Sequence, residues 1–231
     1  MQAIKAILFD LGGTLVETSH LEAISYISRK VSEELNVDQK ILEEKLINNF
    51  KEIFKKAGEG RFKTVTKIIE ESLLNSIQDI NNLNLFKKVR SFYKEYIEKE
   101  VKIYPNVYNV LNSLRQMKLK LGIISNSDTY LIRCVLKKFS LDKFFDVVVT
   151  SSMSKAYKPS PKLFKLGLLK LGLSADQVVF VGNSDKDIEG AKTVGMITVL
   201  LKTKETSKLQ VSPDFIISNL DEVPQLVKQS I

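Results

Sequence analysis

The sequence contains one cysteine, one histidine and no long apolar run, and these shortages narrow the class of protein. Cys134 has no second cysteine to pair with, so no intrachain disulfide is possible. Its apolar neighbours look like the packing face of a helix, and we expect a small buried hydrophobe rather than a nucleophile. No run of eighteen apolar residues exists, and Asp10 interrupts the first apolar segment before a signal peptide could form. We therefore expect a soluble, cytoplasmic protein with no membrane partner.

Acidic residues are outnumbered, since 35 lysines and arginines stand against 27 aspartates and glutamates, for a formal net charge of +8. This excess suits an anionic partner. The lysines are scattered among glutamates, however, and form no signature of a nucleic-acid-binding module. We expect a small anionic substrate, no nucleic acid, and a monomer or homodimer. With 231 residues and 44% apolar content, the chain can form a core with a second, smaller lobe.

The N-terminal segment joins an apolar run to a carboxylate and two glycines. Residues 6–9 are apolar without alternation, which suits a strand covered on both faces in a parallel sheet. Ligands of such sheets bind beyond the carboxyl ends of the strands, where Asp10 falls. Gly12 and Gly13 let the backbone approach a phosphate or metal closely. The alternative is a plain strand and glycine turn, with Asp10 as a turn former.

The spacing of apolar residues predicts two kinds of region. Residues 17–99 show three- and four-residue spacing, which predicts helices over 22–35, 38–56, 65–74 and 85–99. Apolar runs then alternate with helical segments, with strands expected at 121–124, 145–150, 178–181, 197–201 and 215–217. The intervening helices are expected at 107–117, 130–139, 162–171 and 188–193, with a loop over 151–161. This alternation predicts an α/β fold with a doubly wound parallel sheet: residues 1–16 and 100–231 form the core, and residues 17–99 form a helical insert.

Polar residues follow four of the expected strands, at the edge where such a sheet binds ligands. They are Asp10, Ser125 with Asn126, Lys158, and Asn183 with Asp187. Together they supply a carboxylate nucleophile, a hydroxyl donor, a cation and an oxygen-rich metal site. Such a set suits displacement at an anionic centre.

In the order and spacing of these motifs, the sequence resembles the haloacid dehalogenase superfamily of hydrolases, over nearly the whole chain. The four motifs are Phe9 to Leu15, Ile124-Ser125-Asn126, Lys158-Pro159 with Pro161, and Val181 to Ala191. The resemblance implies a Rossmann-like core, with residues 17–99 as the helical cap. It also implies a phosphatase-like hydrolase.

The resemblance assigns a role to each matching residue. Asp10 would attack the substrate and form an aspartyl ester, Lys158 would neutralise Asp10 and the anion, and Thr14 would shape the turn. The phosphate oxygens would be held by Ser125, the Asn126 backbone and Gly13. Mg²⁺, weakly bound, would be held by Asp10, the Gly12 carbonyl, Asn183 and Asp187.

Two positions depart from the family pattern. Gly12 stands where most phosphatases of the family have the acid that protonates the leaving oxygen and later activates water. Asn183 replaces an acid that usually ligates the metal; its amide oxygen can still bind a hard cation but brings no charge. Ser184, Asp185 and Glu189 are candidates to compensate, although Asp185 suits a helix cap equally well.

Because positions 12 and 183 carry no acid, other functions within the family remain as alternatives. The 2-haloacid dehalogenases use neither metal nor general acid, but they have Tyr at the position of Gly12, usually Tyr at Phe164, and Asn at Ser184. Phosphonatases have a small residue at position 12 and a cap lysine, for which the candidates are Lys51, Lys55 and Lys56. His20 is a candidate substitute acid or base, although a solvated side chain is the commoner case. A non-catalytic binder of phosphorylated ligands is the last alternative, and a Mg²⁺-dependent phosphatase acting on a small metabolite is our prediction.

Overall fold

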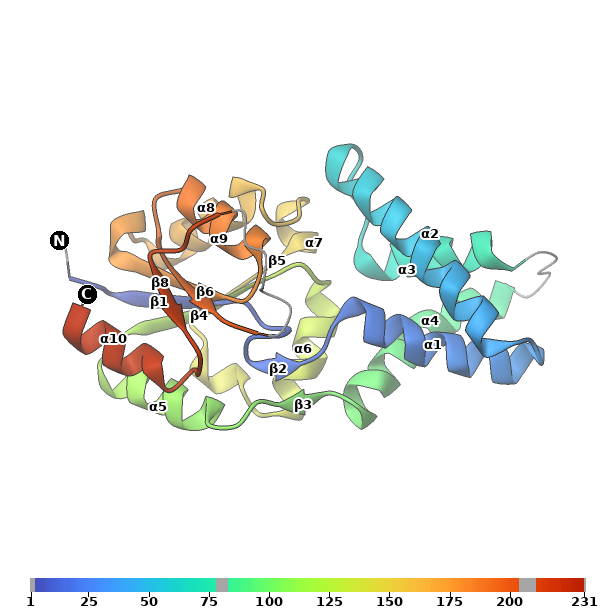
Figure 1. Cartoon of the computed structure of the whole chain (residues 1–231), viewed down its shortest axis with the longest axis horizontal. Coiled ribbons are helices and arrows are strands. Elements are labelled where there is room, and N and C mark those ends of the chain that lie inside the picture. Colours follow the sequence, from blue (N-terminus) through green and yellow to red (C-terminus); the bar gives the residue numbers. More distant parts are fainter. Residues whose placement is uncertain (1–2, 78–82, 204–210, 231) are drawn as a thin grey trace. The chain divides into compact units, whose positions relative to one another are not determined.

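The computed structural model describes residues 3–77, 83–203 and 211–230 and separates into two compact units (Figure 1). One unit comprises residues 1–17, 102–126 and 139–231 and contains a β-sheet. The other comprises residues 18–101 and 127–138 and is helical. Within the described ranges, no helix is long and apolar enough to cross a membrane.

The first unit is built on a parallel six-stranded sheet in the order β5-β4-β1-β6-β7-β8. Its strands are β1 (Ala6–Phe9), β4 (Lys120–Ser125), β5 (Val147–Thr150), β6 (Val178–Gly182), β7 (Ile197–Leu201) and β8 (Phe215–Ile217). The chain adds β4 and β5 on one side of β1, and then adds β6, β7 and β8 on the other. The carboxyl end of β1 therefore lies at the topological switch point, where such sheets bind ligands. The predicted α/β fold with a parallel sheet is confirmed.

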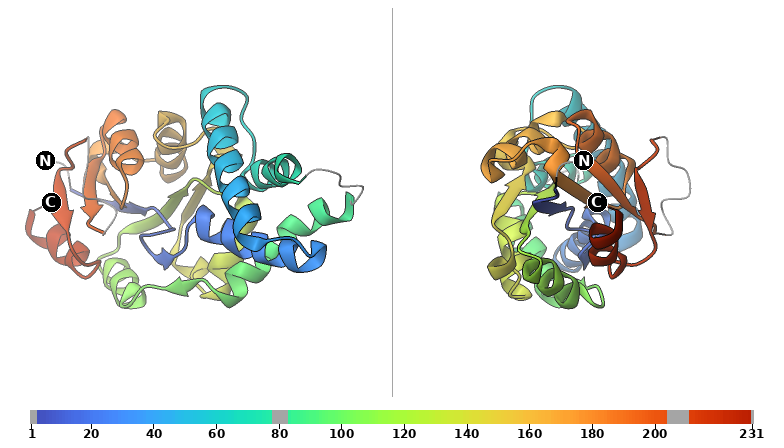
Figure 2. Two further views of the ribbon diagram at one scale, coloured as in Figure 1. Left: turned by 45° about the vertical axis from the view of Figure 1, so that its right-hand side comes forward. Right: turned by 90° about the vertical axis from the view of Figure 1, so that its left-hand side faces the viewer.

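Helices cover both faces of this sheet (Figure 2). One face carries α8 (Pro161–Leu171) and α9 (Asp185–Thr193); the other carries α5 (Val107–Gln116), with α10 (Glu222–Ser230) beside it. The start of α8 follows from its sequence, because the Ser160 side chain caps it and Pro161 occupies its first position.

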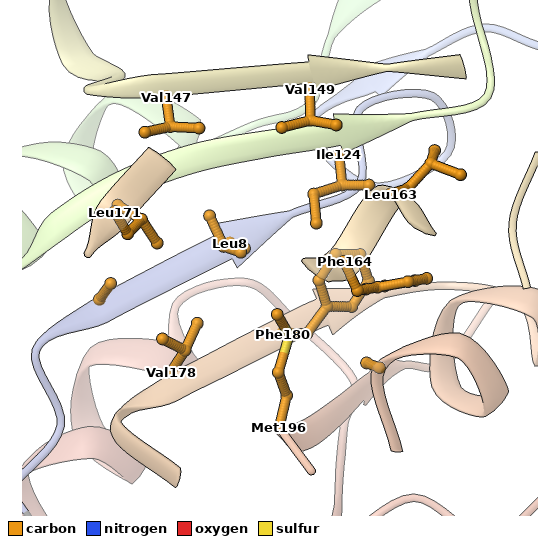
Figure 3. Packing of buried hydrophobic residues seen from close by; sticks show 12 residues of the cluster. Leu8, Ile124, Val147, Val149, Leu163, Phe164, Leu171, Val178, Phe180 and Met196 are labelled. Atoms are coloured by element: carbon orange, nitrogen blue, oxygen red, sulfur yellow. The ribbon is translucent and has the colours of Figure 1, made fainter. Parts of the chain in front are cut away.

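The sheet is packed by an apolar layer beneath α8 and α9 (Figure 3). Phe164 from α8 meets Phe180 from β6 edge to face, with ring centroids 5.1 Å apart. Both side chains are fully buried, and each contributes roughly 1.5–3 kcal/mol by leaving water. Leu8 and Ile124 belong to the same cluster, so the core is built on the two strands that lead to the candidate site.

Several short elements of the first unit are absent from the sequence prediction. The segment 151–161, expected to be a loop, begins with α7 (Ser151–Ser154). A two-stranded antiparallel pair joins β2 (Val16–Glu17) to β3 (Lys102–Ile103). The sequence prediction also lacks η1 (Asp142–Phe144), η2 (Ala175–Gln177) and α10. All of these elements are too short to show a clear apolar period.

The helical unit contains the four predicted insert helices. They are α1 (His20–Leu35), α2 (Gln39–Glu59), α3 (Val65–Ser76) and α4 (Leu83–Lys99). In this unit α1 packs beside α4, and α2 beside α3. Side-chain caps decide where three of the helices begin, since Ser19, Asp38 and Thr64 each accept a hydrogen bond from the backbone of the first turn.

Residues 127–138, assigned to the core from the sequence, group with the helical unit. Asp128 is buried, and its two carboxylate oxygens accept hydrogen bonds from the Val65 and Thr66 amides at 2.8 and 3.0 Å and from the Thr66 hydroxyl at 2.6 Å. At the other end of α6 (Thr129–Lys138), the Lys138 ammonium donates to the Ile97 and Val101 carbonyls. The segment thus caps α3 at its N-terminus and α4 near its C-terminus.

Cys134, which we expected to be fully buried, is only half-buried.

We predict that Asp128→Asn lowers the free energy of unfolding by roughly 1–3 kcal/mol, because one amide oxygen cannot replace the bonds of two carboxylate oxygens. Urea denaturation followed by circular dichroism measures this. The matched control is Asp38→Asn, since exposed Asp38 caps α2 through a single bond of 2.9 Å and asparagine caps helices equally well. Equal losses in the two variants would contradict the role assigned to Asp128.

Candidate active site

The centre of the candidate site is a buried lysine between two carboxylates. The Lys158 ammonium lies 2.5 Å from Asp10 Oδ1 and 2.6 Å from Asp187 Oδ1, and it also donates to the Ile124 carbonyl at 3.1 Å. Asp10 follows β1, Lys158 lies in the loop before α8, and Asp187 lies in the first turn of α9. The three side chains expose only 2–10% of their surface. Three of the four predicted strand ends are therefore joined by direct ion pairs.

Burial and charge together set the protonation of this cluster. Burial raises the pKa of Asp10 to about 6; the Asp187 charge also raises it, while Lys158 lowers it. Burial lowers the pKa of Lys158, but the charges of Asp10 and Asp187 outweigh this and leave it above its usual value. Lys158 is thus protonated at neutral pH, and the Asp10 carboxyl is a weaker acid than an ordinary aspartate.

Asp187 is held in place by the backbone at the start of α9. Its Oδ2 atom accepts hydrogen bonds from the Ser184 hydroxyl at 2.6 Å, the Ser184 amide at 3.1 Å and the Asn183 amide at 3.3 Å. The preceding Gly182 must be glycine, because a Cβ there would lie 2.5 Å from that of Asp187. Both Asp187 oxygens accept hydrogen bonds from protein donors, one of them from Lys158, and its expected place among the metal residues stays a prediction.

The helix cap at α9 is Ser184, not Asp185. Asp185 is the half-buried first residue of the helix, and Glu189 lies exposed further along it. A serine followed three residues later by an acidic residue resembles a capping box, so this feature could have been recognised from the sequence.

The turn after β1 brings the candidate metal donors together. Gly13 has φ +78°, and a Cβ there would lie 2.4 Å from the amide nitrogen of Asn183, so only glycine fits. The Thr14 hydroxyl donates to Asn183 Oδ1 at 3.3 Å and lies 3.5 Å from Asp10 Oδ2. An Asp10 oxygen and an Asn183 oxygen therefore both lie within 3.5 Å of the Thr14 hydroxyl.

Ser125 and Asn126 occupy the end of β4, the strand beside β1. Ser125 is buried as the last residue of the strand. The Asn126 side chain accepts from the Lys158 amide at 2.7 Å and donates to the Lys158 carbonyl at 3.4 Å. Sequence reasoning assigned only the backbone of Asn126, and the side-chain contact depends on a loop conformation that no sequence pattern predicts.

The other candidates belong to the helical unit. His20 is half-buried, and its Nδ1 atom lies 2.9 Å from the Tyr93 hydroxyl, so it is not simply solvated. Lys51, Lys55 and Lys56 are exposed, and Lys56 pairs with Glu52. These three lysines have the surface character that the sequence favoured over a Schiff-base role.

The oxygen donors near Thr14 decide which metal ion the site can hold. Across the described residues, no group of three or more His, Cys, Asp or Glu side chains is arranged as a metal site. The oxygens of Asp10 and Asn183 that meet at Thr14, with the Gly12 carbonyl close by in sequence, remain as donors. Such oxygens fit a hard cation such as Mg²⁺, but with a single carboxylate among them.

A family model described as haloacid dehalogenase-like hydrolase matches residues 7–201, from β1 to the end of β7. The chain belongs to this family. The resemblance seen in the four motifs is confirmed, and the chain is an enzyme of the hydrolase class.

Relatives with full-length similarity include two hydrolases of phosphate compounds. Glyceraldehyde 3-phosphate phosphatase of Methanocaldococcus jannaschii is 32% identical over 232 residues, and the match covers 97% of each chain. Pyrophosphatase PpaX of Listeria monocytogenes is 27% identical over 235 residues, again with 97% of each chain covered.

Solved structures share the fold over almost their whole length. A haloacid dehalogenase-type phosphatase from Thermococcus onnurineus is similar with a TM-score of 0.70 and 26% identity, covering 97% of this chain and 98% of that one. The L-2-haloacid dehalogenase of Xanthobacter autotrophicus gives a TM-score of 0.76 at 20% identity, covering 99% and 100%. The second likeness establishes the fold alone.

We predict that the melting temperature of metal-free Asp10→Asn, relative to that of wild type, rises as pH rises from 5 to 7.5. Because the pKa of Asp10 is raised in the folded state, its contribution to stability is full below its unfolded pKa of 3.8 and is lost as pH rises through about 6. Asparagine does not titrate, so the difference in melting temperature between the two proteins should shift by several degrees in favour of Asp10→Asn over this range.

Thermal unfolding in EDTA at several pH values measures this effect. Asp176→Asn, the same substitution at an exposed position, is the control. A difference between Asp10→Asn and wild type that stays constant or shrinks with rising pH would contradict the raised pKa.

Proposed function

We propose that this protein is a Mg²⁺-dependent phosphatase that acts on a small phosphorylated metabolite, with Asp10 as nucleophile. The observation that carries the proposal is the buried Lys158 ammonium between Asp10 and Asp187. A fixed cation beside a carboxylate nucleophile offsets the repulsion between that carboxylate and a phosphate dianion. The 32% identity with glyceraldehyde 3-phosphate phosphatase supports this substrate class.

In the proposed reaction, an Asp10 oxygen attacks the phosphorus atom while the bond from phosphorus to the leaving oxygen breaks. Water then attacks the phosphorus of the aspartyl phosphate, which releases inorganic phosphate and restores the carboxylate. Lys158 holds the Asp10 side chain and neutralises charge. The Ser125 hydroxyl and the Asn126 amide are assigned to the phosphate oxygens.

Asp10, Asn183 and the Gly12 carbonyl would hold the Mg²⁺. When bound, the ion supplies positive charge to the phosphate oxygens. Thr14 keeps the Asp10 and Asn183 oxygens close together, which prepares the pair for a shared cation. Asp187 supports the site by holding Lys158.

Gly12 cannot donate a proton, so we predict that the leaving group controls the rate. A general acid is typically worth 10²- to 10⁴-fold, so p-nitrophenyl phosphate and acetyl phosphate should be hydrolysed much faster than glycerol or sugar phosphates. The measurement is phosphate release in Mg²⁺ with chemistry rate-limiting. If His20 replaces the missing acid, His20→Ala should slow the alkyl esters selectively.

Asp10→Asn, run in the same assay, should be folded and inactive. A folded Asp10→Asn protein that keeps a tenth or more of the wild-type rate would overturn the assignment of Asp10. Equal wild-type rates across leaving groups, unchanged in His20→Ala, would mean that the acid function is supplied elsewhere.

A dehalogenase is the second candidate, favoured by the absence of carboxylates at positions 12 and 183. Breaking a carbon–halogen bond needs no proton on the leaving group and no metal. Chloride release from 2-chloropropionate in EDTA, without phosphate release in Mg²⁺, would favour this candidate over the phosphatase.

We predict that Asn183→Asp tightens Mg²⁺ binding and lowers the Mg²⁺ concentration for half-maximal phosphatase activity by about tenfold, since Mg²⁺ is normally held through carboxylates. Calorimetric titration and phosphate release measure the two effects. Asp176→Asn serves as the control for a change of one charge, because exposed Asp176 lies in η2 at the other end of β6 from Asn183. Unchanged Mg²⁺ affinity in Asn183→Asp would contradict a metal site at residue 183.

A further inference from the structure

The side chain of Asn126 binds both backbone groups of Lys158. Its Oδ1 atom accepts from the Lys158 amide at 2.7 Å, and its Nδ2 atom lies 3.4 Å from the Lys158 carbonyl. The two residues are 32 positions apart in the chain and belong to different elements, since Asn126 follows β4 and Lys158 follows α7. This two-point contact ties the loop that carries Lys158 to the end of a central strand.

Lys158 needs such support because its side chain is long and its ammonium must reach three partners at once. The ammonium must lie within hydrogen-bond distance of Asp10, Asp187 and the Ile124 carbonyl at once. Ordering a lysine side chain also costs rotamer entropy, because the free side chain has many conformations. A fixed Lys158 backbone limits the positions that the ammonium can occupy, and so keeps it within reach of these three partners.

The loop that carries Lys158 also contains a turn of its own. The Ser160 amide donates to the Tyr157 carbonyl at 2.9 Å, which closes a turn around Lys158 and Pro159 within the loop itself. Within the part of the chain that the structure describes, the Asn126 side chain ties the Lys158 backbone to the end of β4 through two hydrogen bonds. The position of the turn relative to β1 therefore depends on Asn126.

We propose that the side chain of Asn126 is the positioning residue for Lys158. The side chain acts on the reaction through Lys158, whose backbone it holds. This role is separate from that of the Asn126 backbone amide, which is assigned to a phosphate oxygen. This inference rests on the proposed phosphatase function.

The kinetic test is a double-mutant cycle between Asn126→Ala and Lys158→Met with p-nitrophenyl phosphate. Asn126→Ala alone should lower kcat by roughly 10- to 100-fold with a much smaller change in KM, because a displacement of about 1 Å costs a catalytic group on this scale. In the Lys158→Met background, the same substitution should change kcat/KM by less than about threefold, since residues that act as a unit are not additive. Equal losses in both backgrounds would overturn the proposal.

Conservative and control variants sharpen the kinetic result. Asn126→Asp keeps the acceptor for the Lys158 amide but not the donor to its carbonyl, so it should recover part of the rate lost in Asn126→Ala. Asn49→Ala removes a comparable side-chain amide, which donates to Ser76 in the helical unit at 2.9 Å, and should leave kcat and KM unchanged. An Asn126→Asp protein no faster than Asn126→Ala would contradict the importance of the 2.7 Å bond.

A second measurement needs neither phosphatase activity nor a Lys158 variant. Hydrogen exchange followed by NMR should show the Lys158 amide exchanging at least about tenfold faster in Asn126→Ala than in wild type, with the β1 amides unchanged. An unchanged Lys158 amide would overturn the proposal. If wild type releases no phosphate, the proposed function fails, while this exchange result still decides whether Asn126 holds Lys158.

Discussion

The constraint on which the site depends is the burial of the Lys158 ammonium between two carboxylates. An ammonium removed from water must be fully paired, and the loss of one partner from a buried ion pair typically costs 3–5 kcal/mol. Asp10, Asp187 and the Ile124 carbonyl supply the partners, each from a different strand end or helix start. The sheet topology allows this arrangement, because β1 lies at the switch point with β4 on one side and β6 on the other.

The surrounding residues keep the two carboxylates in distinct roles. Asp187 Oδ2 is bound by Ser184 and the backbone at the start of α9, so this acid is a fixed support. Asp10 Oδ2 lies at a longer distance, 3.5 Å, from the Thr14 hydroxyl, and burial raises the pKa of Asp10. This difference supports the proposal that Asp10, which lies in the first motif of the family, is the nucleophile.

The sequence predicted the sheet, the insert helices and the residues at the strand ends, because apolar periodicity and motif spacing report directly on those features. It did not predict that residues 127–138 would join the helical unit, since this depends on Asp128 capping a helix that begins 63 positions earlier in the chain. The side-chain contact from Asn126 to the Lys158 backbone was missed for the same reason. Both are long-range polar contacts, and they leave no periodic trace in a sequence.

In the proposed phosphatase reaction, Gly12 and Asn183 supply no acid, so the rate depends more on Lys158 and on the leaving group, with Asp10 as the proposed nucleophile. The most direct test of this account is to quench a single turnover of p-nitrophenyl phosphate with acid and to map the protein by mass spectrometry. We predict a phosphoryl adduct on the peptide that contains Asp10. Phosphate release with no adduct on that peptide, or with an adduct on another residue, would contradict the account.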